Sequence, residues 1–106
     1  LSGSPSYMAP ELVSGKMPNE QSDLFSVAVI LYQMLSGDLP FKGNDVHSVL
    51  YNIVQGEAEP IENKVAGLPD DIRRLFGKIL SKNPTDRFAD ARQLKHELGD
   101  LQAKYG

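Results

Sequence analysis

The sequence predicts an all-α fold in which about five helices surround one central, buried apolar helix. In three separate segments, apolar residues recur at the i, i+3, i+4, i+7 spacing that is typical of helices with one buried face. Residues 24–35 differ, because apolar side chains occupy almost every face of this stretch. A helix that is apolar all round is expected to be buried on all sides, so we place this segment at the centre of the fold.

A short helix is expected first, over residues 9–13. Pro10 suits the first helical position, where no N–H is needed, and Gly15 suits the stop. The polar residues 16–20 include a proline and are expected to form a loop.

The central helix follows this loop. Ser22 is expected to cap it, and Asp23 lies in its first turn, near the positive end of the helix dipole. Gly37 is expected to end the helix, and residues 38–43 have the composition of a turn.

The third helix is expected over residues 45–55, with Asp45 as its cap and Gly56 as its stop. Its apolar stripe consists of Val46, Val49, Leu50, Ile53 and Val54. Residues 57–67 show no periodicity and are predicted to be loop.

The fourth helix is expected over residues 69–82, with Lys78 and Lys82 near its negative end. Its stripe consists of Ile72, Leu75, Phe76, Ile79 and Leu80. After a break at residues 83–85, Asp90 starts a fifth helix over residues 90–101. That stripe consists of Ala91, Leu94, Leu98 and Leu101, and a frayed end is expected at Tyr105 and Gly106.

Composition excludes several classes of function. The chain has 106 residues, 41% of them apolar, and a net charge of −3, which gives no electrostatic footprint for nucleic acid or for an anionic membrane. It contains no cysteine, and no residue cluster indicates a metal site. A cytoplasmic location is expected, with no membrane contact by this segment, and the leucine at position 1 suggests that residues upstream are absent.

Four short motifs occur in order along the chain: G-S-P-x-Y-x-A-P-E at residues 3–11, S-D-x-F-S at 22–26, L-S-G-D-L-P-F at 35–41, and K-N-P-T-D-R-F at 82–88. Each motif alone is weak. Together, with helices of the right type between them, they resemble the C-terminal part of a eukaryotic-type serine/threonine protein kinase domain, a family that includes bacterial members. The resemblance covers residues 2–101 and implies that residues 1–106 are the C-terminal subdomain of the protein-kinase-like fold.

The resemblance implies a substrate-binding loop formed by Gly3, Ser4, Pro5 and Tyr7. Ser4 takes the place of a hydroxyl residue that lies near the catalytic aspartate in the serine/threonine branch. The loop shapes the pocket for the residue after the phosphoacceptor, so that the acceptor hydroxyl points in line at the γ-phosphate of ATP.

The resemblance also implies structural roles. Ala9, Pro10 and Glu11 form the A-P-E motif, and Glu11 is expected to pair with Arg87, whose guanidinium can bind a carboxylate with two hydrogen bonds. In the family, the aspartate at the place of Asp23 accepts backbone N–H bonds from the catalytic loop. That loop is not in this sequence, so a plain helix-cap role for Asp23 remains open.

The ATP-binding and catalytic motifs of the family, G-x-G-x-x-G, V-A-I-K, H-R-D-x-x-x-x-N and D-F-G, are not in the sequence. The chain is therefore expected to be a fragment that contains no catalytic residue and binds neither ATP nor Mg²⁺ alone. The parent would use both to phosphorylate Ser or Thr of protein substrates. A pseudokinase or a helical interaction module is the alternative.

One further expectation concerns self-association. The other helices can cover only part of residues 24–35, so the isolated chain is expected to bury the rest by oligomerising or by swapping segments.

Overall fold

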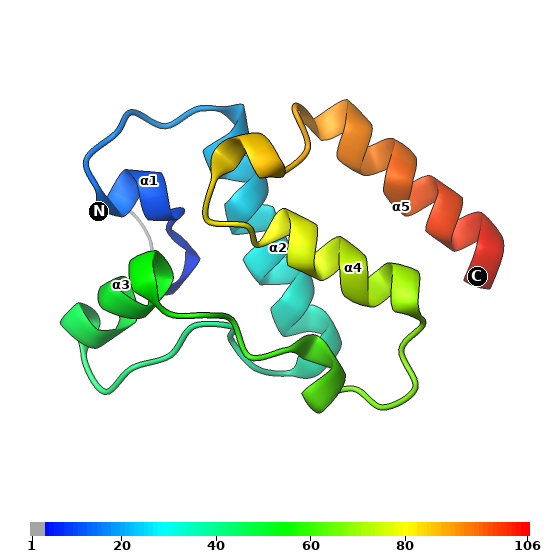
Figure 1. Cartoon of the computed structure of the whole chain (residues 1–106), viewed down its shortest axis with the longest axis horizontal. Coiled ribbons are helices and arrows are strands. Elements are labelled where there is room, and N and C mark those ends of the chain that lie inside the picture. The colour runs from blue at the N-terminus through cyan, green and yellow to red at the C-terminus, as the bar shows by residue number, and fades with distance from the viewer. Residues whose placement is uncertain (1–3) are drawn as a thin grey trace.

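The computed structural model describes residues 4–106, which form five α-helices, three short 3-10 helices and no strand (Figure 1). In chain order these are η1 (Pro5–Tyr7), α1 (Pro10–Val13), α2 (Glu20–Ser36), α3 (Val46–Gln55), η2 (Ile61–Asn63), α4 (Asp70–Ile79), η3 (Pro84–Asp86) and α5 (Ala91–Tyr105). The predicted all-α fold is confirmed.

Helix α2 lies in the middle of the molecule. Helices α1 and α3 lie on one side of it and pack on each other, while α4 crosses α2 on the other side and α5 lies beyond α4 (Figure 1). The core joins these groups through aromatic contacts: Phe25 of α2 stacks on Phe41 with ring centroids 6.0 Å apart, and Tyr32 meets the ring of Phe76 edge-on at 6.0 Å.

The start of α2 differs from the prediction. Asn19, not Ser22, is the cap: its Oδ1 accepts from the Ser22 N–H at 2.9 Å, and the Ser22 Oγ accepts from the Asn19 N–H at 2.8 Å. With this reciprocal capping box, the helix begins at Glu20, two residues before Ser22. Gly37 ends α2 with a φ of 75°, a left-handed conformation that favours glycine.

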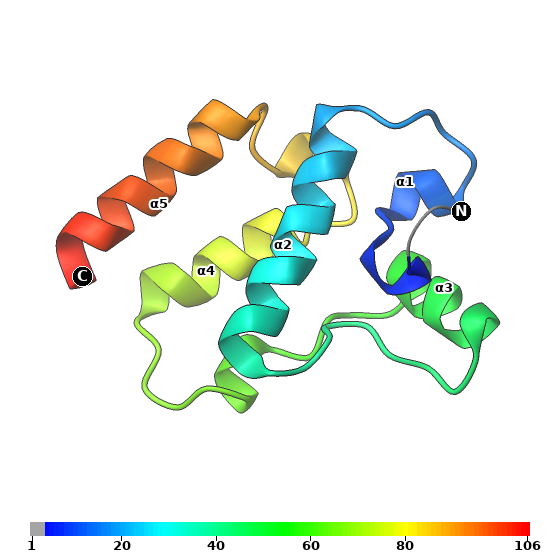
Figure 2. The same ribbon diagram turned by 180° about the vertical axis from the view of Figure 1, so that it is seen from behind.

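The expectation that α2 is buried on all sides is wrong. One face is buried, but Val27, Ile30 and Met34 are 40%, 46% and 77% exposed. Seen from behind, α2 lies in front and no other element crosses it (Figure 2). These three residues share one helical face with Asp23, and we call the set the uncovered stripe of α2. The other helices cover only part of α2. This agrees with the separate expectation that they could not cover all of residues 24–35.

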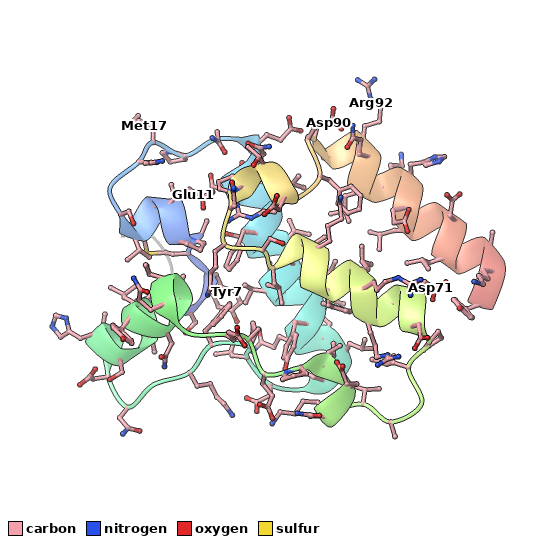
Figure 3. The ribbon with its side chains drawn as sticks, in the orientation of Figure 1. Tyr7, Glu11, Met17, Asp71, Asp90 and Arg92 are labelled. Atoms are coloured by element: carbon pink, nitrogen blue, oxygen red, sulfur yellow. The ribbon has the colours of Figure 1, made fainter. Side chains whose placement is uncertain are left out.

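The later helices correct two further expectations. Helix α4 ends at Ile79, so Lys82 lies beyond its last turn. Helix α5 begins after the predicted cap, Asp90, but continues to Tyr105 instead of fraying. The Lys104 Nζ and the Tyr105 hydroxyl donate to the Asp71 carboxylate of α4 at 2.9 and 2.8 Å, and this tie holds the end of α5 (Figure 3).

Candidate functional site

The predicted substrate loop lies against α2. Pro5 opens the η1 turn, and the Ser4 Oγ accepts from the Ser6 N–H at 3.3 Å. The Tyr7 hydroxyl donates to Gln33 Oε1, and the Ser26 Oγ donates to the Tyr7 carbonyl at 2.6 Å. Two residues of α2 thus hold the loop by its side chain and its backbone. Gly3 lies outside the described residues.

The A-P-E motif forms the start of α1. Ala9 precedes the helix in an extended conformation, Pro10 occupies its first turn, and both are buried. Glu11 follows and is only 7% exposed, although it is charged. The motif therefore directs a carboxylate into the protein (Figure 3).

Arg87 receives that carboxylate. The residue follows η3, 76 positions along the chain from Glu11, and is 3% exposed. Its Nη1 and Nη2 donate to the two carboxylate oxygens of Glu11 at 2.8 and 2.9 Å, a two-point geometry that a guanidinium suits and an ammonium does not.

The remaining donors of Arg87 are also used. They donate to the carbonyls of Ser81, Gln21 and Lys82 at 2.8, 3.0 and 3.2 Å, so all five N–H groups of the guanidinium have acceptors. The guanidinium also lies 4.8 Å from the centroid of the Phe25 ring. We call Glu11, Arg87 and these carbonyls the junction. It fastens α1, which follows the predicted substrate loop, to α2 and to the segment between α4 and α5.

The electrostatics of Glu11 agree with this geometry. Burial raises the pKa of its carboxyl, but the hydrogen bonds and charge of Arg87, with a backbone hydrogen bond and the charge of Lys16, together lower it by more, so the pKa lies below its usual value. Glu11 is therefore ionised at neutral pH, as a bound partner of a guanidinium should be.

Asp23 takes no part in the junction. It is exposed in the first turn of α2, and its carboxylate accepts none of the hydrogen bonds that join residues 4–106. Within the described chain, its position is that of a helix-dipole acid at the head of the uncovered stripe.

Lys82 is a structural residue that sequence reasoning misplaced. Its Nζ donates to the carbonyl of Ile53 at 2.5 Å and to that of Asn52 at 3.3 Å, so it binds the end of α3 instead of α4. The Nζ also lies 4.0 Å from the Phe41 ring centroid. Burial lowers the pKa of Lys82 to about 8. The sequence points to the end of α4, because that end lies next to Lys82 along the chain, whereas Ile53 is 29 positions away and is reached only through the tertiary fold.

Comparison with known proteins identifies the class. Residues 1–98 match the family model described as "Protein kinase domain", and the chain belongs to this family. It is 38% identical to the serine/threonine-protein kinase pkn3 of Myxococcus xanthus and 32% identical to PknB of Mycobacterium tuberculosis, in each case over 91% of this chain. It is 31% identical to the probable serine/threonine-protein kinase CPE1738 of Clostridium perfringens over 94% of the chain.

The chain is short beside these relatives, since the matched part spans 14–18% of their lengths. The family and the all-helical architecture together define a C-terminal portion of a kinase domain, as the four motifs predicted. Among residues 4–106, no helix is long and apolar enough to span a membrane.

Proposed function

We propose that this chain is the substrate-facing and structural part of a serine/threonine protein kinase, which transfers the γ-phosphoryl group of ATP to Ser or Thr of proteins. The observation that carries the proposal is the junction. It joins a substrate-type loop to the helical body through a buried ion pair whose donors are all satisfied. Positioning of the reactants is, with electrostatic stabilisation, one of the two main contributions that a protein makes to phosphoryl transfer.

Within this proposal, residues 4–7 bind the acceptor peptide and Ser4 approaches the catalytic aspartate. Ser4 is exposed, as a group that must meet another part of the enzyme should be. The chain alone would be inactive, because ATP and Mg²⁺ are held by motifs that its sequence does not contain.

The uncovered stripe of α2 fits the same proposal. Asp23 lacks an acceptor role among the described residues, and Val27, Ile30 and Met34 leave apolar surface open to water. We assign this face to the part of the kinase domain that carries the catalytic loop, with Asp23 accepting backbone N–H groups from it.

The substrate role is tested in the kinase domain that contains this chain, by transfer of labelled γ-phosphate to a peptide. Tyr7→Phe removes the bond to Gln33, and we expect kcat/KM for the peptide to fall about 3- to 10-fold, with the KM for ATP unchanged. Tyr51→Phe is the matched control, because Tyr51 is 66% exposed on α3. Equal peptide kinetics for both variants would contradict the role of the loop.

A pseudokinase or scaffold is the competing function, in which helices α3 and α4 bind partners and no phosphate is transferred. The observation that favours it is the exposed start of the α3 stripe, where Val46 is 53% exposed. The sequence of the rest of the protein distinguishes the two functions. The catalytic aspartate of H-R-D and the aspartate of D-F-G would indicate an enzyme, and their loss would indicate a scaffold.

In isolation, the chain is expected to self-associate through the uncovered stripe, because the stripe then has no other cover. Light scattering after size exclusion measures this. Met34→Lys should shift the chain toward monomer, while Met17→Lys, at an exposed methionine in the loop before α2, should not. A wild-type chain that is monomeric and binds no hydrophobic dye would refute the expectation.

A further inference from the structure

Helix α3 forms a second wall for the predicted substrate loop, in addition to α2. Residues 5–7 lie between the two helices, and α3 packs on this η1 turn and on α1 (Figures 1 and 2). Two hydrogen bonds, donated by Tyr7 and Ser26, hold the loop on α2, but none joins residues 4–8 to α3. On this side the position of the loop therefore depends on packing, and so on where α3 itself lies.

Few contacts fix the position of α3. One of its ten residues, Ile53, is buried, against three of ten in α4, so the apolar core holds α3 less firmly than α4. Asn52 donates from its Nδ2 to the Lys42 carbonyl at 2.6 Å, but this acceptor lies in the segment just before the helix. A hydrogen bond that reaches α3 from a distant part of the chain is therefore expected to matter for its position.

Lys82 supplies that long-range contact. Its Nζ donates to the carbonyls of Ile53 and Asn52 at 2.5 and 3.3 Å, across 29 and 30 positions of the chain. Within residues 4–106, no other hydrogen bond reaches α3 from outside residues 42–56. Both carbonyls belong to the last turn of α3, the negative end of the helix dipole, where a cation is favoured.

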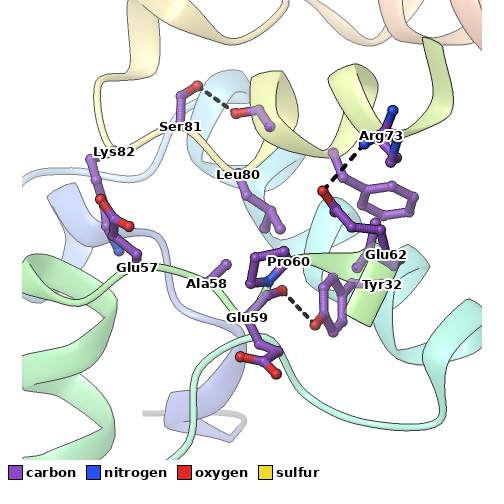
Figure 4. A pocket seen from close by; sticks show the side chains of 13 residues that line it. Tyr32, Glu57, Ala58, Glu59, Pro60, Glu62, Arg73, Leu80, Ser81 and Lys82 are labelled. Carbon is purple, nitrogen blue, oxygen red and sulfur yellow. Dashed lines mark hydrogen bonds and ion pairs between the residues drawn. The ribbon is translucent and has the colours of Figure 1, made fainter. Parts of the chain in front are cut away.

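Lys82 is itself held in place. Arg87 of the junction donates to the carbonyls of Ser81 and Lys82 at 2.8 and 3.2 Å, which fixes the backbone from which the lysine side chain starts. The Nζ lies 4.0 Å from the centroid of the buried Phe41 ring. Figure 4 shows Glu57 close to the lysine side chain, so the ammonium also has a counter-charge nearby. Lys82 thus connects the junction, through its backbone, to α3, through its side chain.

We propose that Lys82 is a positioning residue for the substrate loop: by anchoring the end of α3, it places the wall on which residues 5–7 pack. The inference rests on the proposed function, because it takes these residues as the binding site of the acceptor peptide. Lys82 acts through α3 and needs no contact with the peptide. Because the junction binds α1 and the backbone of Lys82, α1 and α3 are both fastened to residues 81–87.

The test uses the kinase domain that contains this chain and measures transfer of labelled γ-phosphate to a peptide. Lys82→Cys should raise the peptide KM about 3- to 10-fold, the scale of one lost hydrogen bond, and leave kcat and the KM for ATP unchanged. A loop that is less often in its binding arrangement binds the peptide more weakly but, once occupied, reacts at the same rate. Lys95→Cys, at an exposed position on α5, is the matched control.

Alkylation separates the role of the ammonium from a general loss of stability. Treatment of Lys82→Cys with 2-bromoethylamine converts the introduced thiol into an aminoethyl thioether, whose ammonium takes the place of the lysine Nζ. The chain itself has no cysteine, and the wild-type domain treated in parallel corrects for thiols elsewhere. The peptide KM should return to the wild-type value. If Lys82→Cys does not fold, Lys82→Met removes the donor but keeps the stem, and the peptide KM should rise in the same way. A peptide KM that does not rise, or that stays raised after complete alkylation, would overturn the proposal.

A second measurement follows the loop without phosphate transfer. In a domain made with isotope-labelled tyrosine, the amide signals of Tyr7 and Tyr51 report separately on the loop and on α3. Both signals should shift in Lys82→Cys and return after alkylation. A shift confined to Tyr51 would show that the anchor acts on α3 alone, against the proposal. A wild-type domain that transfers no phosphate would instead contradict the proposed function, so the two failures are distinct.

Discussion

Two carboxylates hold distant segments of this chain together, and they differ mainly in their contact with water. Glu11 binds Arg87 inside the protein, where the two side chains are 6% and 0% exposed. Asp71 binds Lys104 and Tyr105 at the surface, where the lysine side chain is 62% exposed. Both ties use short, charge-assisted hydrogen bonds, at 2.8 to 2.9 Å.

The comparison shows why similar geometry does not mean similar energy. When an exposed ion pair breaks, both side chains form hydrogen bonds with water instead. Its loss therefore changes the free energy of unfolding only slightly. A buried pair that loses one partner leaves a charge without solvent or counter-ion, which is strongly destabilising. The junction should therefore control the stability of the fold, while the Asp71 tie should control only the position of the end of α5.

The largest effect is expected for Arg87→Met. This change removes the donors that Arg87 supplies to the Glu11 carboxylate and to three carbonyls, and we expect the free energy of unfolding to fall by about 3–5 kcal/mol. Urea denaturation followed by circular dichroism measures it. The control is Arg92→Met at an exposed position on α5, which should change little (Figure 3). Similar losses in both variants would show that the junction is not special.

Acid provides the second test of the junction. Because the pKa of Glu11 is lowered in the folded state, the unfolded state binds more protons at mildly acidic pH. The stabilisation is complete above the usual pKa of 4.5 and is lost as the pH falls through the lower, folded-state pKa. The stability advantage of the wild-type chain over Glu11→Gln should shrink over this range. An advantage that does not change with pH would contradict the assignment.

Lys82 should give a pH dependence of the same sign as Glu11, but in the alkaline range. Its pKa is lowered to about 8 in the folded state from a usual value of 10.5, so between these values the unfolded state binds more protons. The free energy of unfolding should therefore rise with pH across this window, and Lys82→Met should abolish the rise. Thermal unfolding at a series of alkaline pH values measures it, with the exposed Lys95→Met as the control.

The smallest effect is expected for Asp71→Asn. The tie at the end of α5 is exposed, so the unfolding midpoint should move by only a small fraction of the Arg87→Met shift, and less at high salt. Hydrogen exchange should nevertheless speed up at residues 102–105, where the helix loses its anchor. A shift in the midpoint as large as that of Arg87→Met would reverse the ranking of the two ties.

Local signals were sufficient for much of the fold. The caps Asp45 and Asp90, the stop at Gly37 and the apolar stripes placed four of the helices to within a few residues. The cap of α2 was misplaced because Asn19 and Ser22 act as a reciprocal pair, and from sequence either residue is a good cap. The extension of α5 to Tyr105 depends on Asp71, a partner that local sequence does not reveal.

The sequence by itself determined the family and the helical class, because ordered motifs and helical periodicity are carried by residue identity. Through the resemblance to the family, it also implied the pairing of Glu11 with Arg87. Only the tertiary structure decided which surfaces are buried. It left one face of the most apolar helix exposed and placed the Lys82 ammonium at the end of α3. Burial depends on which elements meet in space, and segments far apart in the chain carry no local record of that meeting.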